Sequence, residues 1–385
     1  MKTLYFSLLK LLIKSGYVFL LLSFTATAKE PIQFLHLGQS LLLQPAEQGY
    51  SLSYAGQQLN IDLSNRLILK TEPAMTAASI QGMHPAIQQV QQLAVLNKAV
   101  LWLVHLTSDH ELPALLLLLQ QQKGVFYAQP DLQQQRQKAG LVSARSEAKT
   151  ITPETPQKAQ RQIRVAVIDD GFSQHVVEQS GFRQVVQYDA DLKLADASPK
   201  AAQDRHGDKV LLLVAQSAGL DPKAHQPIDL ISIRQVSSWT SDIVLGFAVA
   251  RMMQADIVNS SWLLAFLPEP LFDLLNDWSQ QNQPYLVFAA GNNRQDACKV
   301  NAFSQLPRAI IVAAAEADQG LMASSNYGPC IDLRAQGAHQ LLSATAELQR
   351  FNGTSAAAAY VSGKLVRLLS QNQRPDLITL QKQLR

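Results

Sequence analysis

Five apolar, β-rich runs recur through the second half of the chain and constrain its fold more than any other feature. They lie at 163–168, 228–233, 255–259, 285–290 and 309–314. Stretches of helical character alternate with them, for example at 241–254 and 270–281. Continuous apolar runs are typical of strands buried on both faces, and their alternation with helices indicates a parallel sheet covered by helices on both faces. We therefore expect an α/β domain at 163–385.

Side chains capable of chemistry follow these runs in a fixed order. Asp169 ends the first run, His206 opens a helix-like segment, and Asn292 follows the fourth run. Ser355 then stands directly before four alanines at 356–359, where a helix is expected to begin. Taken alone, Ser355 is better explained as a serine that caps an ordinary helix. Because the carboxyl ends of parallel strands share one edge of a sheet, the four side chains can converge there.

These four residue types suit acyl transfer. A serine hydroxyl such as that of Ser355 is a poor nucleophile until a base takes its proton, and His206 can be that base near neutral pH. The carboxylate of Asp169 would fix the tautomer of the imidazole. The amide of Asn292, with the backbone N–H of Ser355, would hold the developing oxyanion. No cofactor is required for this chemistry.

Residues 163 to about 370 resemble the catalytic domain of the subtilisin-like serine proteases, the subtilase or S8 peptidase family. The matching segments lie at 167–171, 206–207, 289–292, 324–333 and 352–355. The resemblance implies a serine endopeptidase that forms an acyl-enzyme, with Asp169, His206 and Ser355 as the triad and Asn292 as the oxyanion donor. It also implies substrate contacts from Ser261, Trp262, Leu263, Ala290 and Gly291. Asp170 is expected to have no catalytic role.

The chain also departs from the family pattern. The departures are Asp208 for threonine, Leu211 and Leu212 for Ala-Gly, Ala359 for proline, and Leu263 and Leu264 for glycines of the substrate cleft. The last two are expected to narrow or reshape the cleft. The departures keep open a second function, a subtilase-fold protein that binds peptides or a partner without turnover. A lipase or esterase is disfavoured because no Gly-x-Ser-x-Gly motif surrounds Ser355.

The first 28 residues have the pattern of a secretory signal peptide. Three lysines precede a short apolar run at 16–24, and small residues at 26–28 offer a cleavage site. An uncleaved anchor is the alternative, but the run is shorter than the roughly 20 residues that span a bilayer. No cysteine stands at the cleavage point, which argues against a lipoprotein. We expect export to the periplasm or the extracellular space and no membrane span in the mature protein.

Export bears on the two cysteines, Cys298 and Cys330. They are either two free thiols or one disulfide, which an oxidising compartment permits. Secreted subtilases that this chain resembles bridge these two regions, so the resemblance implies a disulfide.

The region at 29–131 needs its own interpretation. Its end reads as a strand at 99–106, a helix at 112–122 and a strand at 125–128. This unit resembles the second half of a subtilase propeptide, the intramolecular chaperone and inhibitor of the family; a permanent accessory domain is the alternative. A polar linker with two prolines follows at 132–162 and is the expected place of proteolytic processing.

Composition narrows the partners. The net charge is +3 and 16% of residues are charged, with no basic stripe of the kind that binds nucleic acid. Calcium is frequent in the family, but no carboxylate-rich loop here has distinctive ligand spacing. We therefore expect polypeptide substrates and no nucleic acid, and leave a structural calcium open.

Overall fold

The computed structural model describes residues 29–134, 137–138, 149–150, 161–224, 226–342 and 348–384. Residues 32–385 form one compact unit, distinct from residues 1–31. The predicted signal peptide at 1–28 and most of the predicted linker at 132–162 lie outside the described residues. In the part of the chain that is described, no helix is long and apolar enough to cross a membrane.

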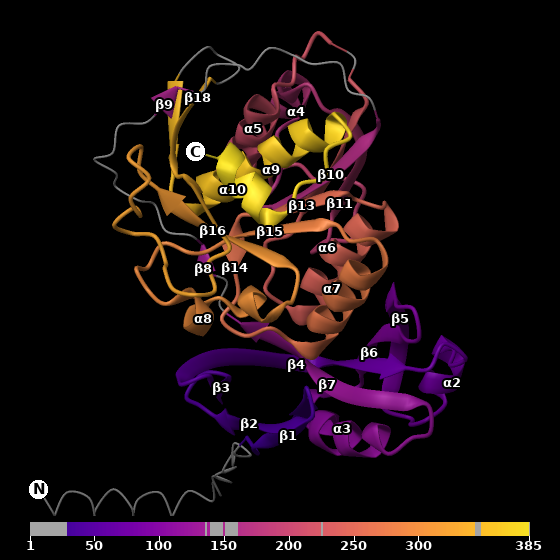
Figure 1. Cartoon of the computed structure of the whole chain (residues 1–385). Coiled ribbons are helices and arrows are strands. Elements are labelled where there is room, and N and C mark those ends of the chain that lie inside the picture. The colour runs from indigo at the N-terminus through magenta and orange to yellow at the C-terminus, as the bar shows by residue number, and fades with distance from the viewer. Residues whose placement is uncertain are drawn as a thin grey trace, which may run out of the picture. The chain divides into compact units, whose positions relative to one another are not determined.

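A seven-stranded parallel sheet organises the second half of the chain (Figure 1). Its strands, in spatial order, are β11 (Arg183–Asp189), β12 (Ile228–Arg234), β10 (Ile163–Asp169), β13 (Ile257–Ser260), β15 (Tyr285–Ala289), β16 (Ala309–Ala315) and β17 (Leu333–Gln336). Every neighbouring pair is parallel. The predicted parallel sheet is confirmed. The two edge strands, β11 and β17, were not predicted, because β11 alternates between exposed and half-buried positions and β17 is short.

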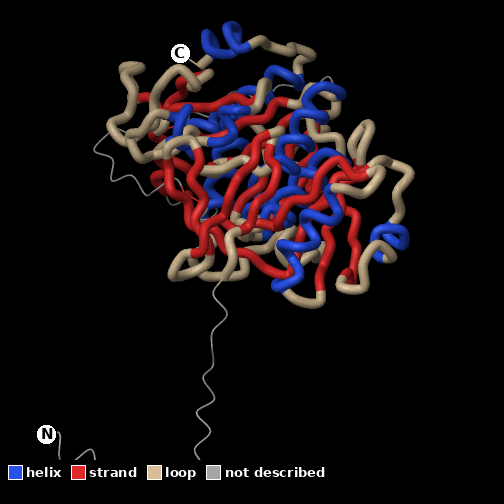
Figure 2. Tube along the Cα trace, turned by 90° about the horizontal axis from the view of Figure 1, so that it is seen from below, coloured by secondary structure: helices blue, strands red, loops and turns tan. Residues whose placement is uncertain are grey.

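Helices cover both faces of this sheet, as predicted. One face carries α4 (Gln174–Ser180), α5 (His206–Ala218), α9 (Thr354–Ser370) and α10 (Leu377–Gln383), and the other carries α6 (Thr240–Met252) and α7 (Glu269–Gln281). Val165 and Val167 of β10 enter the first core, whereas Ala166 and Ile168 enter the second. Successive side chains of a strand point to opposite faces, which is why a strand between two layers needs an unbroken apolar run. Figure 2 shows the helices in blue packed over the strands in red.

Shorter elements complete the second half of the chain. They are β14 (Trp262–Leu263), α8 (Ala297–Val300), a 3-10 turn (Ala302–Gln305), β18 (Ala338–Leu342) and β19 (Leu348–Asn352). Two pieces of the predicted linker pair with them. β8 (Gln137–Lys138) runs antiparallel to β14, and β9 (Lys149–Thr150) runs parallel to β18. The linker is therefore attached to the second half of the chain at two points.

An antiparallel sheet forms the N-terminal region. Its elements are β1 (Ile32–His36), β2 (Gln39–Pro45), β3 (Tyr50–Tyr54), β4 (Gln57–Thr71), α2 (Ala77–Gln81), β5 (Ile87–Val95), β6 (Val100–Leu106), a 3-10 turn (Asp109–Glu111), α3 (Leu112–Gln120) and β7 (Val125–Gln134). The predicted strand, helix and strand are present as β6, α3 and β7. α3 buries Leu112, Leu115, Leu116 and Leu119. β7 continues to Gln134, beyond the expected domain end at 131, and the first five strands were not predicted.

Candidate active site

Asp169 and His206 are joined by a hydrogen bond. Asp169 is the last residue of β10 and His206 is the first residue of α5, so the fold brings a strand end against a helix start. Nδ1 of His206 lies 2.8 Å from Oδ1 of Asp169. A carboxylate can only accept, so Nδ1 carries the proton and Nε2 is left as the basic nitrogen of the neutral ring. The ring of Phe351 meets the imidazole edge to face at 5.5 Å between centroids.

The neighbouring Asp170 caps the helix that begins with His206. α5 has no side-chain cap of its own, because Arg205 at the N-cap position offers none. Instead, Asp170 accepts hydrogen bonds from the backbone N–H groups of Gly207 at 2.8 Å and His206 at 3.3 Å. Burial, and then the nearby Asp169 carboxylate, raise the pKa of Asp170 above its usual value. Asp170 thus positions His206 through the backbone, a role that the sequence analysis missed.

Asp208, the residue found in place of the expected threonine, is fully engaged. Its carboxylate accepts from the backbone N–H of Ser173 at 2.6 Å and from the Ser173 hydroxyl at 2.7 Å. Ser173 is the N-cap of α4, so this pair ties the start of α4 to the first turn of α5. Arg205 lies 3.6 Å from the same carboxylate. The substitution therefore fits the fold without disturbing His206.

In the family pattern, a small Ala-Gly pair stands where α5 has Leu211 and Leu212. Here the small residue that allows close helix packing lies on the facing helix α9 instead. A methyl group at Gly363 of α9 would collide with the Val214 carbonyl and the Ser217 side chain. The absence of a side chain at Gly363 lets the two backbones approach, while both leucines fill the core beside them. The two helices that carry His206 and Ser355 are thereby held against each other.

Ser355 is the second residue of α9 and is 2% exposed. Its Oγ donates to the carbonyl of Ser261 at 3.0 Å, and the Ser261 hydroxyl donates to the Ser355 carbonyl at 3.1 Å. A hydroxyl has one proton, so Ser355 must release Ser261 before it can donate to His206. Gly353 precedes the helix with a φ of 95°, a left-handed conformation that favours glycine.

Asn292 lies against the turn that precedes Ser355. Its Oδ1 accepts from the backbone N–H of Thr354 at 2.9 Å, and the Thr354 hydroxyl accepts from the N–H of Gly291 at 3.0 Å. A β-carbon on Gly353 would lie 2.8 Å from Nδ2 of Asn292. The amide therefore lies across Gly353, with its oxygen held by the backbone and its NH₂ group as a donor beside the start of α9.

The side chains of the predicted substrate-binding residues Trp262 and Leu263 are buried. The indole of Trp262 is buried in the core and donates to the Ile168 carbonyl at 2.9 Å. Only the backbone of Trp262 can therefore contact a peptide. Leu263 is 1% exposed and packs against the α-carbon of Gly291. The carbonyl of Ala290 accepts from Asn326 Nδ2 at 2.8 Å.

Asn326 was not predicted to have a role, although it lies in the matching segment at 324–333. It is fully buried and its Oδ1 accepts from the N–H groups of Asn293 at 3.1 Å and Gln295 at 2.9 Å. Together with its bond to Ala290, this side chain fixes the loop that carries Asn292. The signal in the sequence was the segment itself.

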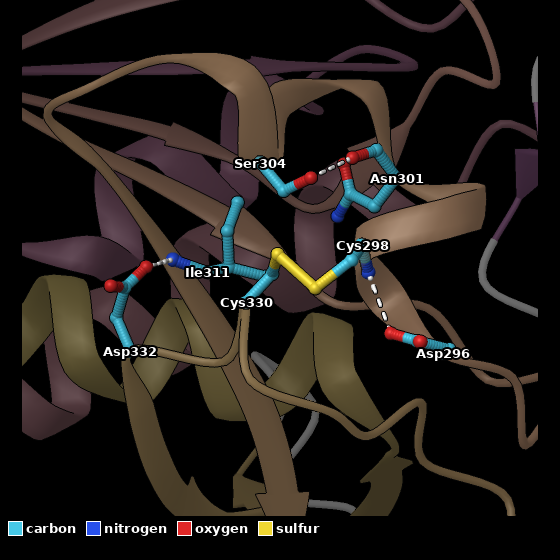
Figure 3. The surroundings of a disulfide bond; sticks show 7 residues. All are labelled: Asp296, Cys298, Asn301, Ser304, Ile311, Cys330 and Asp332. Carbon is cyan, nitrogen blue, oxygen red and sulfur yellow. Dashed lines mark hydrogen bonds between the residues drawn. A yellow bond between two sulfur atoms is a disulfide. The ribbon is translucent and has the colours of Figure 1, made fainter. Parts of the chain in front are cut away.

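The predicted disulfide between Cys298 and Cys330 is confirmed, with 5.2 Å between the α-carbons (Figure 3). Asp296 accepts from the N–H of Cys298 at 3.0 Å, and the N–H of Ala297 donates to the Tyr327 carbonyl at 2.7 Å. The bridge joins the loop after Asn292 to the turn after Asn326. The described residues contain no group of three or more His, Cys, Asp or Glu side chains placed to hold a metal ion.

The chain resembles known proteins in sequence. The model of the subtilase family, peptidase S8, matches residues 160–383, more than half of the chain. The subtilisin-like serine protease Rho m 2.0101 of Rhodotorula mucilaginosa is 32% identical over 110 residues, which are 28% of this chain and 32% of that protein. Proprotein convertase subtilisin/kexin type 9 of Mus musculus is 37% identical over 107 residues, 26% of this chain and 15% of that protein. The chain thus spans about a third or less of these relatives.

A solved structure extends the likeness in fold. It is fervidolysin from Fervidobacterium pennivorans, described as a keratinolytic enzyme related to subtilisin. The TM-score is 0.60 at 15% identity, over 83% of this chain and 56% of that chain. The covered share exceeds the segment matched by the family model, so the similarity in fold takes in part of the N-terminal region.

Proposed function

The chain belongs to the subtilase family, and on that premise we propose that it is an exported serine endopeptidase. The observation that carries the proposal is the 2.8 Å bond between His206 and Asp169, formed at the strand edge where α9 presents Ser355. The family supplies the reaction class, hydrolysis of polypeptides. The arrangement of side chains supports the roles that we propose for them.

Asp169, His206 and Ser355 would act as one unit. Nε2 of His206 would take the proton of Ser355 Oγ as the oxygen attacks the carbonyl carbon of the peptide. The C–N bond then breaks, the leaving amine takes that proton, and water hydrolyses the resulting ester. The negative oxygen of each tetrahedral intermediate would accept from the Asn292 amide and the Ser355 backbone N–H. The N-terminus of α9 adds a favourable partial positive charge.

We assign the N-terminal domain the role of a propeptide that occupies the cleft. Its support begins at β8, which adds an antiparallel strand to β14, with Lys138 opposite Trp262 and Gln137 opposite Leu263. Addition of a strand to a sheet edge is an ordinary way to bind a peptide. β14 directly follows Ser261, the hydrogen-bond partner of Ser355. A strand in this place excludes other peptides from the same edge.

Phe266 gives the N-terminal domain an anchor. Its ring is fully buried and belongs to the core formed by the N-terminal sheet, 4.7 Å from the ring of His36. The Gln134 carboxamide donates to the Phe266 carbonyl at 2.8 Å and accepts from its N–H at 3.0 Å. Gln134 thus satisfies both backbone groups of a residue inserted into the partner domain. Buried aromatic anchors of this kind dominate interface energies.

A row of carboxylates on α7 receives the N-terminal domain. Glu269 accepts from the N–H of Leu37 at 2.8 Å and from Gln129 Nε2 at 2.8 Å. One turn further on, Asp273 lies 2.9 Å from Lys70. These polar contacts surround the apolar core that α6 and α7 share with strands β5, β6 and β7. An interface with a buried apolar centre and these polar contacts around it suits an inhibitor that stays bound after cleavage.

Export is the third part of the proposal, and residues 1–28 would direct it. The disulfide supports it, since structural disulfides persist in oxidising compartments such as the periplasm and the extracellular space.

A second candidate function is peptide or partner binding without turnover. The hydrogen bond from Ser355 Oγ to the Ser261 carbonyl favours it, because it engages the proton that His206 would have to accept. The alternative predicts a full-length protein with no processing by its own serine.

Intact mass measurement of exported wild-type protein and of the Ser355→Ala variant tests the proposal. We expect wild-type protein to lose its N-terminal domain from the polypeptide, and Ser355→Ala to retain it. A wild-type enzyme that is fully active at full length would contradict the propeptide and favour a permanent accessory domain. Identical processing of both proteins would assign the cleavage to another protease.

A further inference from the structure

The pairing of β8 with β14 fixes a register for peptides in the cleft. The strands are antiparallel, with Lys138 opposite Trp262 and Gln137 opposite Leu263. Because the strands are antiparallel, a peptide bound in this register places its next residue, after the one opposite Trp262, opposite Ser261. Since Ser355 Oγ lies 3.0 Å from the Ser261 carbonyl, that residue is the one whose own carbonyl comes nearest to the nucleophile.

Strand geometry then decides where the side chain of that residue goes. Residues opposite each other in an antiparallel pair share a face, and so do residues two apart along one strand. In a peptide bound in this register, the residue opposite Ser261 therefore projects to the face occupied by Leu263. The two side chains are diagonal neighbours, about 7–8 Å apart at their β-carbons or less.

Leu263 fills the space on that face. Its flanking residues, Trp262 and Leu264, belong to the core over α6 and α7, whereas Leu263 belongs to none of the three apolar cores of the described residues. With β8 paired to β14, it is only 1% exposed. A methyl group on Gly291 would lie 2.5 Å from Leu263 Cδ2, so the leucine reaches from β14 to the loop that carries Asn292.

We propose that Leu263 closes the pocket beside Ser355 and restricts cleavage to bonds that follow a small residue, namely glycine, alanine or serine. The inference rests on the proposed peptidase function and adds its substrate class. It also names the first substrate, because the residue after Lys138 in the sequence is Ala139 and Gly140 follows it. The processing cleavage would then fall between Ala139 and Gly140.

Two peptides that differ only in alanine or phenylalanine before the scissile bond test the restriction on the mature enzyme. Exclusion of a large side chain from a closed pocket predicts that kcat/KM favours alanine by about 10–200-fold. Leu263→Gly should raise kcat/KM for the phenylalanine peptide by about 10-fold or more and leave the alanine peptide within a factor of about 3. Leu263→Ala should give an intermediate ratio and serves if the glycine variant folds poorly.

Leu264→Ala is the matched control, because Leu264 does not line the cleft as expected from the sequence but lies fully buried in the core over α6 and α7. It should lower the melting temperature without changing the ratio between the two peptides. Equal cleavage of both peptides by the wild-type enzyme, or an unchanged ratio in Leu263→Gly, would overturn the proposal.

The chain's own processing gives a second, independent measurement. N-terminal sequencing of mature wild-type protein should begin at Gly140. Ala139→Phe should slow processing at this bond by about 10-fold or more, and the double variant Ala139→Phe with Leu263→Gly should restore it. Unimpaired cleavage at this bond in the Ala139→Phe protein would overturn the proposal. If the protein reacts with a fluorophosphonate but its cleavage preference is unchanged in these variants, only this inference is wrong. If it does not react at all, the proposed peptidase function is wrong as well.

Discussion

Helices α5 and α6 both begin without a side-chain cap of their own and receive a carboxylate from elsewhere, yet from different places. Asp170, at the end of β10, caps α5, the helix that carries His206. Asp131, in β7 of the N-terminal domain, caps α6 by accepting from the N–H of Ser241 at 2.9 Å and from its hydroxyl at 2.8 Å. The first cap comes from the same domain as its helix, and the second comes from the N-terminal domain, which we propose to be a propeptide.

The two caps show that α5 is stabilised from within its own domain, whereas α6 is stabilised by the N-terminal domain. A helix N-terminus leaves N–H groups unpaired and favours negative charge, so each carboxylate stabilises the helix it meets. The cap on α5 serves the active site permanently. The cap on α6 makes part of the catalytic domain depend on the N-terminal domain, as expected of an intramolecular chaperone.

The largest effect is expected at the side chains that α5 and α9 present. Ser355→Ala and His206→Ala should each lower kcat/KM by about 10⁴-fold or more, and the double variant should cost little more, because triad members act as a unit. Asp169→Asn should be somewhat milder. Wild-type peptidase activity in pure Ser355→Ala protein would refute the assignment.

Asn292 takes part in neither helix cap, and its substitution gives a loss of kcat with which the effects of the two caps can be compared. Asn292→Leu should lower kcat by about 10²–10³-fold, the size of effect known for one oxyanion donor in subtilisin. Steady-state kinetics on the variant gives the answer. An unchanged kcat would move the oxyanion role to a different donor.

Removal of the cap on α6 should loosen the N-terminal domain. Asp131 is fully buried and pairs with Arg66 at 2.9 Å, so Asp131→Ala leaves a cation without its partner as well as an uncapped helix. The lost cap should weaken binding by about 1–2 kcal/mol, or roughly 5–30-fold, whereas the unpaired Arg66 lowers the stability of the N-terminal domain itself. Recovery of peptidase activity on dilution of processed protein measures it. Recovery at the wild-type rate would remove Asp131 from the interface energetics.

The same carboxylate predicts a pH dependence. Burial raises the pKa of Asp131 to about 6. The charge of Arg66 and the hydrogen bonds from Ser241 lower this pKa, and the nearby Asp242 carboxylate raises it. In the pH range between about 4 and 6 the bound domain therefore holds a proton that the separated domain has lost. Binding should weaken as pH rises through this range and level off above it.

His36 acts in the opposite direction, because burial lowers its pKa to about 4. The informative quantity is therefore the difference between wild-type protein and Asp131→Asn. In Asp131→Asn, the affinity of the N-terminal domain should no longer fall between about pH 4 and 6. The opposite pH dependence that comes from His36 should remain. Parallel profiles would show that Asp131 does not titrate on dissociation.

The smallest effect is expected at the cap on α5. Asp170→Ala should cost about 1 kcal/mol of stability and reduce kcat, since it loosens the helix start that carries His206. Asp170→Ser should retain substantial activity, because the serine hydroxyl can still accept one hydrogen bond from the N–H groups at the start of α5. Thermal unfolding and kinetics on both variants check this. Equal damage from the two would indicate that the charge matters and the cap does not.

The parallel sheet could be predicted from the sequence because its inner strands are buried on both faces and leave continuous apolar runs. β11 and the N-terminal strands β1 to β5 carry polar residues at exposed positions, and a short alternation is a weak signal. Their pairing depends on contacts between distant segments. The disulfide could be predicted from the resemblance to secreted subtilases, whereas the two cysteines alone were also compatible with free thiols.

The candidate site divides in the same way. Residue type and order indicated Asp169, His206, Asn292 and Ser355. The capping bond of Asp170, the support from Asn326 and the contact of Leu263 with Gly291 join segments that only the folded chain brings together. The sequence shows two leucines at 263 and 264, but only the folded chain shows that Leu263 reaches Gly291 while Leu264 enters the core over α6 and α7.

We propose that Ser355 is a nucleophile activated by His206. Treatment of the purified protein with a fluorophosphonate, followed by mass spectrometry of its peptides, tests it most directly. We expect one stoichiometric adduct on Ser355. His206→Ala should greatly slow its formation, and Asp170→Ser should largely preserve it. A protein that stays unlabelled after release of its N-terminal domain, or that is labelled at a serine other than Ser355, would contradict the account.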